Sequence, residues 1–322
     1  MLQGCCSIHC FARGRVVGGY LVARPFYRLV EMTDCIELHS CQVEGLRIQY
    51  REINSPSTDS TLTAARKPIV VLLHPSPRSS LMFEPWMKLL APWFHVLAMD
   101  TPGYGGSDSL PQQPTSLSDY LPALNACLQK TIGAPCLLYG SATGAQLAIA
   151  YAHRYPDQIA HLFLDNAAHL DDHERQHLLA HYFPDLTPND KRDHLKVAWQ
   201  MARGMLTHFP WFEHTPSHRI SPREPSAAEI HAVMMEFLAA GPSYSAAYRA
   251  AMAHEKVEHV MALKIPTTVF RWEGSVLLKY IDKLLSFQLP DHIQTVNTPI
   301  DMKERYRIMT DHLRQCALRT SP

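Results

Sequence analysis

The chain has 322 residues, of which 46% are hydrophobic, so it can bury the core of one large α/β domain with an insertion. Its 30 basic and 30 acidic residues cancel, which argues against a nucleic-acid partner. No apolar run approaches the roughly 18 residues of a membrane-spanning helix, and the eight cysteines are too sparse for a disulfide framework. We therefore predict a cytoplasmic protein without nucleic-acid or membrane partners, and leave its oligomeric state open.

Residues 1–31 differ in composition from the rest of the chain. They contain several arginines but no acidic residue before Glu31, and they lack the apolar stretch of a secretory signal. This segment is either an organellar transit peptide or sequence upstream of a natural start at Met32, which we favour. Four potential metal ligands are crowded together here: Cys5, Cys6, His9 and Cys10. Their cramped spacing favours a tail that is disordered or separate from the core over a metal site.

From residue 35 onward, strand and helix patterns alternate. Residues 35–50 alternate in polarity around Val43-Glu44-Gly45, which predicts a β-hairpin, and the polar stretch 55–67 predicts a loop. Continuous apolar runs predict buried parallel strands at 69–73, 95–99, 136–139 and 159–164. Apolar residues at helical spacing predict helices at 83–91, 116–131 and 143–154.

The alternation stops at residue 169 and resumes at residue 263. Between these points the sequence is helical and loop-like, and is rich in histidine, proline and aromatic residues. Strands at 267–271 and 293–296 and helices at 279–287 and 301–316 follow. The pattern predicts an α/β fold with a doubly wound, mostly parallel sheet and an inserted helical cap. The predicted parts are an extension (1–31), the first part of the core (32–168), the cap (169–262) and the last part of the core (263–322).

Three motifs lie where predicted strands end. They are His74-Pro75-Ser76-Pro77, Asp100-Thr101-Pro102-Gly103-Tyr104-Gly105-Gly106-Ser107-Asp108, and Gly140-Ser141-Ala142-Thr143-Gly144. In this order and spacing the chain resembles the α/β-hydrolase fold superfamily over roughly residues 35–318. The first motif is similar to its H-G-x-P oxyanion loop with proline in place of glycine, the second to its D-x-P-G-x-G-x-S-D loop, and the third to its G-x-S-x-G nucleophile elbow. The resemblance implies the fold and hydrolase ancestry, but a fold does not by itself establish a function.

The resemblance also implies a serine nucleophile, a histidine base and an acid. The nucleophile position holds Ala142, whose methyl group cannot attack a carbonyl, and Ser141 beside it is expected to be a turn or packing residue. The acid position falls on Ser275. Glu273, two residues earlier, and Asp165, after an earlier strand, are the alternative acids, although Asp165 could equally cap a turn.

The histidine of the triad has no counterpart at its usual place. The loop at 296–301 contains no histidine, and His292 and His312 are predicted to be surface residues. His74 is predicted to be structural in its loop, with a role as a base as the alternative. Joint substitution of nucleophile, acid and base indicates a chain that no longer performs ordinary triad hydrolysis.

Two backbone N–H donors of the oxyanion hole need no particular side chain. The resemblance assigns them to Ser76 and Thr143, and Thr143 also begins a helix whose N-terminus favours a negative charge. In the cap, Met205 and Trp211 are expected to line a hydrophobic pocket over Ala142, with Ser141 beside them.

Four cap histidines recur at a spacing of four: His169, His173, His177 and His181. Such a row could hold a metal ion, but nothing nearby completes a coordination sphere, so we predict a solvated helix face, with no metal and no cofactor.

Two functions remain open at this stage. The first is an enzyme of hydrolase descent that acts by a non-standard mechanism on a small, largely apolar carbonyl compound. The base would be His74, Asp165 or a cap histidine. The second is a catalytically inactive protein that binds such a molecule. In either case the predicted partner is a small molecule.

Overall fold

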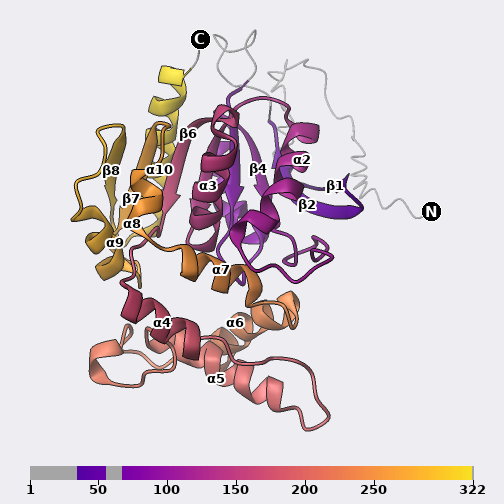
Figure 1. Cartoon of the computed structure of the whole chain (residues 1–322), viewed down its shortest axis with the longest axis vertical. Helices are drawn as coiled ribbons and strands as arrows, with labels where there is room; N and C mark the ends of the chain where they lie inside the picture. The colour runs from indigo at the N-terminus through magenta and orange to yellow at the C-terminus, as the bar shows by residue number, and fades with distance from the viewer. Residues whose placement is uncertain (1–34, 56–66, 321–322) are drawn as a thin grey trace, which may run out of the picture. The chain divides into compact units, whose positions relative to one another are not determined.

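The computed structural model describes residues 35–55 and 67–320. The predicted extension at 1–31, with its four potential metal ligands, and residues 56–66 of the predicted loop lie outside the described residues. Within them, one eight-stranded sheet has the order β1-β2-β4-β3-β5-β6-β7-β8 (Figure 1). The strands are β1 (Glu37–Val43), β2 (Leu46–Ile53), β3 (Ile69–Leu73), β4 (His95–Met99), β5 (Cys136–Ser141), β6 (Ile159–Asp165), β7 (Thr267–Trp272) and β8 (Ile293–Thr298).

The sheet confirms the predicted mostly parallel arrangement. β1 and β2 form the predicted hairpin, closed by Glu44 and Gly45 at positive φ, and β2 pairs antiparallel with β4. All other neighbouring strands are parallel. Their carboxyl ends therefore meet at one edge of the sheet, which is where α/β folds place their sites.

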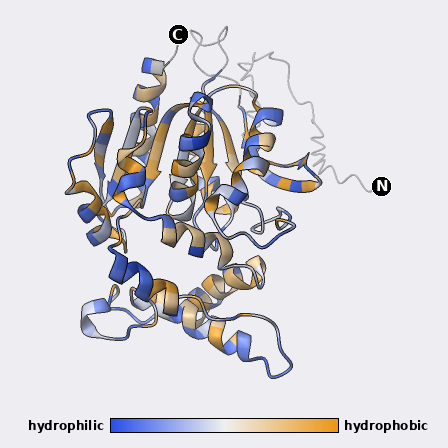
Figure 2. Cartoon of the chain, viewed as in Figure 1, coloured by the Kyte–Doolittle hydropathy of each residue, from blue (hydrophilic) through white to orange (hydrophobic). Residues whose placement is uncertain are grey.

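Helices pack on both faces of the sheet. They are α1 (Glu84–Leu90), α2 (Leu121–Thr131), α3 (Thr143–Arg154), α9 (Leu278–Leu285) and α10 (Met302–Thr320). Residues of β3 alternate between two apolar clusters: Val71 and Leu73 pack with α2 and α3, and Val70 and Leu72 pack with α1 and α10. Because both faces are covered, these strands are apolar throughout, and Figure 2 shows the hydrophobic residues concentrated in the sheet.

Five helices lie between β6 and β7 in the chain, as the predicted insertion requires. They are α4 (Asp172–His181), α5 (Asp193–Thr207), α6 (Ala227–Ala240), α7 (Ala246–His254) and α8 (Val257–Met261). We call residues 172–261 the helical insertion. Tyr182, which is fully buried, contacts the aromatic rings of Phe209 and Tyr248, so this insertion has an aromatic core of its own. No described helix is both long and apolar enough to cross a membrane.

The loop after β4 has a structural role. Its first residue, Asp100, accepts hydrogen bonds from the backbone N–H of Ser80 at 2.7 Å and of Gly106 at 2.9 Å, and from Gln49 Nε2 at 2.9 Å. Ser107 Oγ donates to the Asp100 carbonyl at 2.7 Å. This motif joins β2, β4 and the segment after β3, so it supports the edge of the sheet and does not line the cavity described below.

His254 on α7 gives the protein a testable pH dependence. Its Nδ1 lies 2.9 Å from Gln146 Oε1, and burial, followed by the nearby His259, lowers the pKa of His254 to about 3. The unfolded chain takes up this proton near pH 6.5, so the free energy of unfolding falls as the pH drops below that value. The variant His254→Asn keeps a hydrogen-bond donor but cannot take up this proton. Between pH 6 and 5 we expect its free energy of unfolding to fall by about 1.4 kcal/mol less than that of the natural protein. Urea denaturation at both pH values tests this, and equal losses in the two proteins would contradict it.

Candidate functional site

The turn between β5 and α3 has the tight geometry expected of a nucleophile elbow. Ala142 stands at its apex with φ 47° and ψ −110°, a strained conformation for a residue with a side chain. A Cβ added to Gly140 would lie 2.1 Å from the Gly144 carbonyl oxygen, and one added to Gly144 would lie 2.2 Å from the Leu73 carbonyl oxygen. Strand, turn and helix therefore touch through their backbones, which explains why both positions hold glycine.

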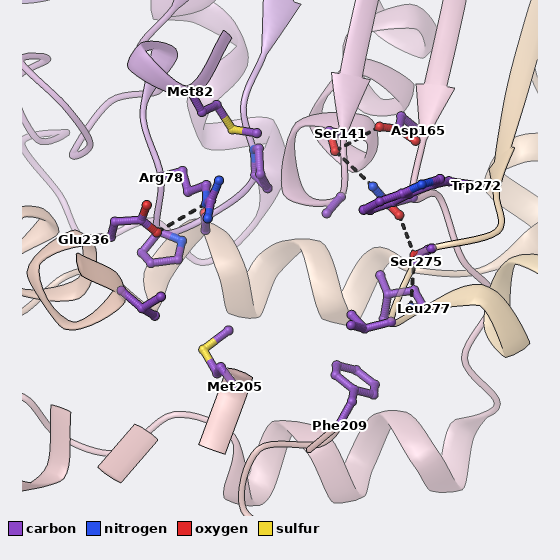
Figure 3. A pocket seen from close by; sticks show the side chains of 18 of the residues that line it. Arg78, Met82, Ser141, Asp165, Met205, Phe209, Glu236, Trp272, Ser275 and Leu277 are labelled. Atoms are coloured by element: carbon purple, nitrogen blue, oxygen red, sulfur yellow. Dashed lines mark hydrogen bonds and ion pairs between the residues drawn. The ribbon is translucent and has the colours of Figure 1, made fainter. Parts of the chain in front are cut away.

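A cavity of about 460 Å³ opens above this turn. Its walls come from the segment after β3, from the carboxyl ends of β5, β6 and β7, from the start of α10, and from α5 and α6 of the helical insertion (Figure 3). Most of the lining is apolar or aromatic, including Met82, Met205 and Phe209. The insertion thus supplies one wall of the cavity, while the sheet edge supplies most of its polar groups.

A buried ion pair occupies the polar end of the cavity. Asp165, at the end of β6, accepts a hydrogen bond at Oδ2 from Arg305 Nη2 of α10 at 2.6 Å, and the side chains are 3% and 5% exposed. Tyr139 OH donates to the same oxygen at 2.6 Å. Burial and then the Asp165 carboxylate hold the pKa of Tyr139 well above its usual value, so this phenol stays a donor. The guanidinium of Arg305 also lies over the Trp272 ring, 4.5 Å from its centroid.

A row of hydrogen bonds crosses the ends of β5, β6 and β7 (Figure 3). Asn166 Nδ2 donates to Ser141 Oγ at 3.3 Å, and Ser275 Oγ donates to Asn166 Oδ1 at 2.6 Å. Ser275 Oγ in turn accepts from the Leu277 backbone N–H at 3.0 Å. Ser141 Oγ lies 3.5 Å from Asp165 Oδ2, at the limit of a hydrogen bond. This row links Ser141 to Ser275, two residues at or beside the positions that the family uses for its nucleophile and acid.

The opposite wall carries a second ion pair. Arg78, in the segment after β3, pairs with Glu236 of α6 at 3.2 Å, and both side chains line the cavity (Figure 3). Partial burial raises the pKa of the Glu236 carboxyl, against the effect of Arg78. This pair joins the core to the helical insertion across the cavity.

The structure places the predicted oxyanion residues on either side of the elbow. Ser76 lines the cavity, whereas Thr143, at the start of α3, is not among its lining residues. Within the described part of the chain, neither the Ser76 nor the Thr143 backbone N–H has a hydrogen-bond partner. His74 does not line the cavity either. It is buried, its Nδ1 lies 3.0 Å from the Pro75 carbonyl, and its Nε2 accepts from the Thr101 N–H at 3.0 Å.

The other predicted site residues divide in the same way. Ser141, Ala142, Asp165 and Met205 line the cavity, whereas Glu273 and Trp211 do not, and the Trp211 indole donates to the Tyr182 carbonyl at 2.9 Å. His312, predicted to be a surface residue, is half-buried: its Nε2 lies 2.9 Å from Thr268 Oγ1, and its ring packs on Phe163. It lies far along α10 from Arg305 and does not line the cavity.

The spaced histidines do not form one row. His169 precedes α4, and its Nδ1 accepts from the Val257 N–H at 3.0 Å. His173, His177 and His181 are exposed on α4, and His177 Nε2 lies 2.6 Å from Glu213 Oε1. No group of three or more potential metal ligands occurs among the described residues.

Sequence reasoning missed Arg305, Asn166 and the Arg78–Glu236 pair. Asn166 directly follows Asp165 at the carboxyl end of a strand, which was a usable signal. The sequence signal for Arg305 was weaker. It is an arginine shortly after the last strand, in the region where the family motif would place a histidine. Nothing in the sequence pairs Arg78 with Glu236, which lie far apart in the chain.

The comparisons with known proteins agree with this geometry. The family model described as alpha/beta hydrolase fold matches residues 68–225. An esterase from Thermogutta terrifontis superposes with a TM-score of 0.60 at 18% identity, covering 89% of this chain and 100% of the esterase. A haloalkane dehalogenase from Bradyrhizobium elkanii gives 0.56 at 19% identity, covering 89% and 97%. Together these findings confirm the α/β-hydrolase fold.

Two curated relatives match over a shorter stretch. An uncharacterised hydrolase of Saccharomyces cerevisiae is 31% identical over 121 residues, which is 36% of this chain and 39% of the relative. Epoxide hydrolase 3 of Xenopus tropicalis is 32% identical over 109 residues, 32% of this chain and 29% of the relative. The match thus spans between a quarter and two fifths of these relatives.

Proposed function

We propose that this protein binds a small, largely apolar carbonyl compound in the cavity beneath the helical insertion, and that it does not hydrolyse it by a serine–histidine–acid mechanism. The observation that carries the proposal is the state of Asp165, whose Oδ2 is bound by Arg305 and Tyr139 beside an apex occupied by Ala142. An acid held in this way does not orient a histidine, and a methyl group cannot attack.

Two further features support binding of a carbonyl group. The backbone N–H groups of Ser76 and Thr143 are unpaired within the described residues, and Ser76 lines the cavity, so its N–H can donate to a ligand oxygen. The lining supplied by Met82, Met205 and Phe209 suits an apolar body attached to that oxygen. The described cysteines are free thiols, in keeping with the proposed cytoplasmic setting.

A fluorophosphonate probe and a thermal-shift assay test this proposal together. We expect no labelling of the natural protein, and a rise in Tm with small apolar carbonyl compounds that are recovered unchanged. Ser141→Ala is the matched control, because it removes the hydroxyl nearest the elbow apex. Labelling of the natural protein that disappears in Ser141→Ala would identify Ser141 as a nucleophile and overturn the proposal.

Hydrolysis by a non-standard mechanism is the second candidate. The matched relatives are named as hydrolases, and Ser141 Oγ lies in the cavity 3.5 Å from Asp165 Oδ2. His208 of the insertion also lines the cavity, and burial lowers its pKa, so it is neutral and able to accept a proton near pH 7. This candidate predicts turnover of an activated ester, lactone or epoxide that both Ser141→Ala and His208→Gln reduce at least tenfold. Unchanged turnover in both variants would exclude these two residues as the catalytic groups.

A further inference from the structure

Arg305 is a buried charged group of the cavity that leaves most of its donors unpaired within the described residues. A guanidinium carries five N–H donors, and a buried arginine ordinarily uses most of them. Among the described residues, Arg305 makes one hydrogen bond, from Nη2 to Asp165 Oδ2. Within the same part of the chain its Nε is buried without a partner and its Nη1 has none, although the side chain is 5% exposed and lines the cavity. Arg305 therefore contacts Asp165 through one nitrogen, Nη2, and the N–H groups on Nε and Nη1 can bind another acceptor.

The neighbouring polar groups also offer donors. Among the residues that the structure describes, Asn166 Nδ2 donates to Ser141 alone, so its second hydrogen has no acceptor there. Ser141 itself has its hydroxyl hydrogen only weakly engaged, 3.5 Å from Asp165. A donor-rich end of a cavity calls for a ligand rich in acceptors.

The charge of Arg305 favours an anionic acceptor. Asp165 engages one end of Arg305 through Oδ2, which also accepts from Tyr139, while Asp165 Oδ1 is buried without a partner among the described residues. Arg305 keeps its own charge at any ordinary pH and lies over the Trp272 ring, which holds it in place without competing for its N–H groups. Planar carboxylates match the geometry of a guanidinium, and their hydrogen bonds to it are stronger than those of a neutral carbonyl.

We propose that Arg305 anchors the carboxylate of an apolar carboxylic acid, which makes it the residue that selects the ligand of this cavity. This rests on the proposed function and sharpens its ligand class from carbonyl compounds to carboxylates. The carboxylate takes up guanidinium N–H groups of Arg305 that Asp165 does not use. The apolar body extends toward Met205 and Phe209 of the helical insertion.

A matched series of ligands tests the anchor by isothermal titration calorimetry at neutral pH. The series is phenylacetate, phenylacetamide and phenylacetone, which share one apolar body and differ in the head group. We expect phenylacetate to bind at least tenfold more tightly than either neutral compound. Equal affinities for phenylacetate and phenylacetone would overturn the anchor and leave the proposed function standing. Absence of binding by all three compounds would overturn both.

Arg305→Lys separates ligand recognition from folding. Lysine keeps a positive charge beside Asp165 but lacks the planar fork. We expect it to reduce the preference for phenylacetate to threefold or less, with the affinity for phenylacetone unchanged. Arg307→Lys is the control, because Arg307 is exposed on the same helix and pairs with Glu304 and Asp311. The double variant Asp165→Asn/Arg305→Gln removes both charges and should likewise lose the preference. A tenfold preference retained in Arg305→Lys and in the double variant would contradict the assignment.

Discussion

Arg305→Ala is expected to lower the free energy of unfolding by about 3–5 kcal/mol, because it leaves the Asp165 carboxylate buried without its cation. Tyr139 would remain as a donor to that carboxylate, but a phenol does not supply a compensating charge. Urea denaturation followed by far-UV circular dichroism measures the loss. Under the proposed function, the same buried pair also keeps Asp165 from serving as a catalytic acid.

Two comparisons make this result interpretable. Asp165→Asn/Arg305→Gln removes both charges, and we expect it to be more stable than Arg305→Ala by at least about 1 kcal/mol, because no lone charge stays buried. Arg307→Ala, at an exposed position of α10, should change stability by no more than about 0.5 kcal/mol. A cost below about 1 kcal/mol for Arg305→Ala would show that the pair is hydrated and would contradict its description as buried.

Gly144→Ala is expected to have an effect of similar size through a different cause. Its methyl group would lie 2.2 Å from the Leu73 carbonyl oxygen and 2.8 Å from that of His74, and backbone cannot yield as a flexible side chain can. Separation of α3 from β3 should cost about 3 kcal/mol or more, or prevent soluble expression. Thermal unfolding and the soluble yield measure this outcome.

Gly241→Ala is the matched control. Gly241 follows α6 at φ 69°, and nothing lies within 4 Å of an added Cβ, so only backbone strain opposes the change. We expect a cost of about 1 kcal/mol for it. If Gly144→Ala were no more costly than Gly241→Ala, the close contact between strand and helix at the elbow would be wrong.

The fold was accessible from local patterns. The apolar runs at 69–73 and 95–99 became β3 and β4 with the same bounds, and the helix at 143–154 became α3 without a shift. Strands covered on both faces must be apolar throughout, so the pattern reports their burial directly. The motif at 100–108 likewise predicted a turn from local sequence. Gly106 and Ser107 form hydrogen bonds with Asp100, only a few residues away in the chain.

The candidate site was accessible only in part. The occupancy of the elbow apex by Ala142 is a property of the sequence alone. The sequence could not tell whether Asp165 is an acid of the site or the cap of a turn. Its contact with Arg305 joins the end of β6 to α10, 140 residues away in the chain. Trp211 was expected in the pocket on the strength of its size, but its indole bonds to Tyr182 and packs within the insertion.

The amino-acid sequence by itself determined the order of strands and helices, the insertion after β6 and the alanine at the apex of the elbow, since each depends on residues close together in the chain. Only the tertiary structure decided which charges meet in the cavity: Arg305 with Asp165, and Arg78 with Glu236. Hydrophobic periodicity is local, so it can be detected within each segment of the sequence. An ion pair between distant segments forms only when the sheet edge, the last helix and the helical insertion pack together.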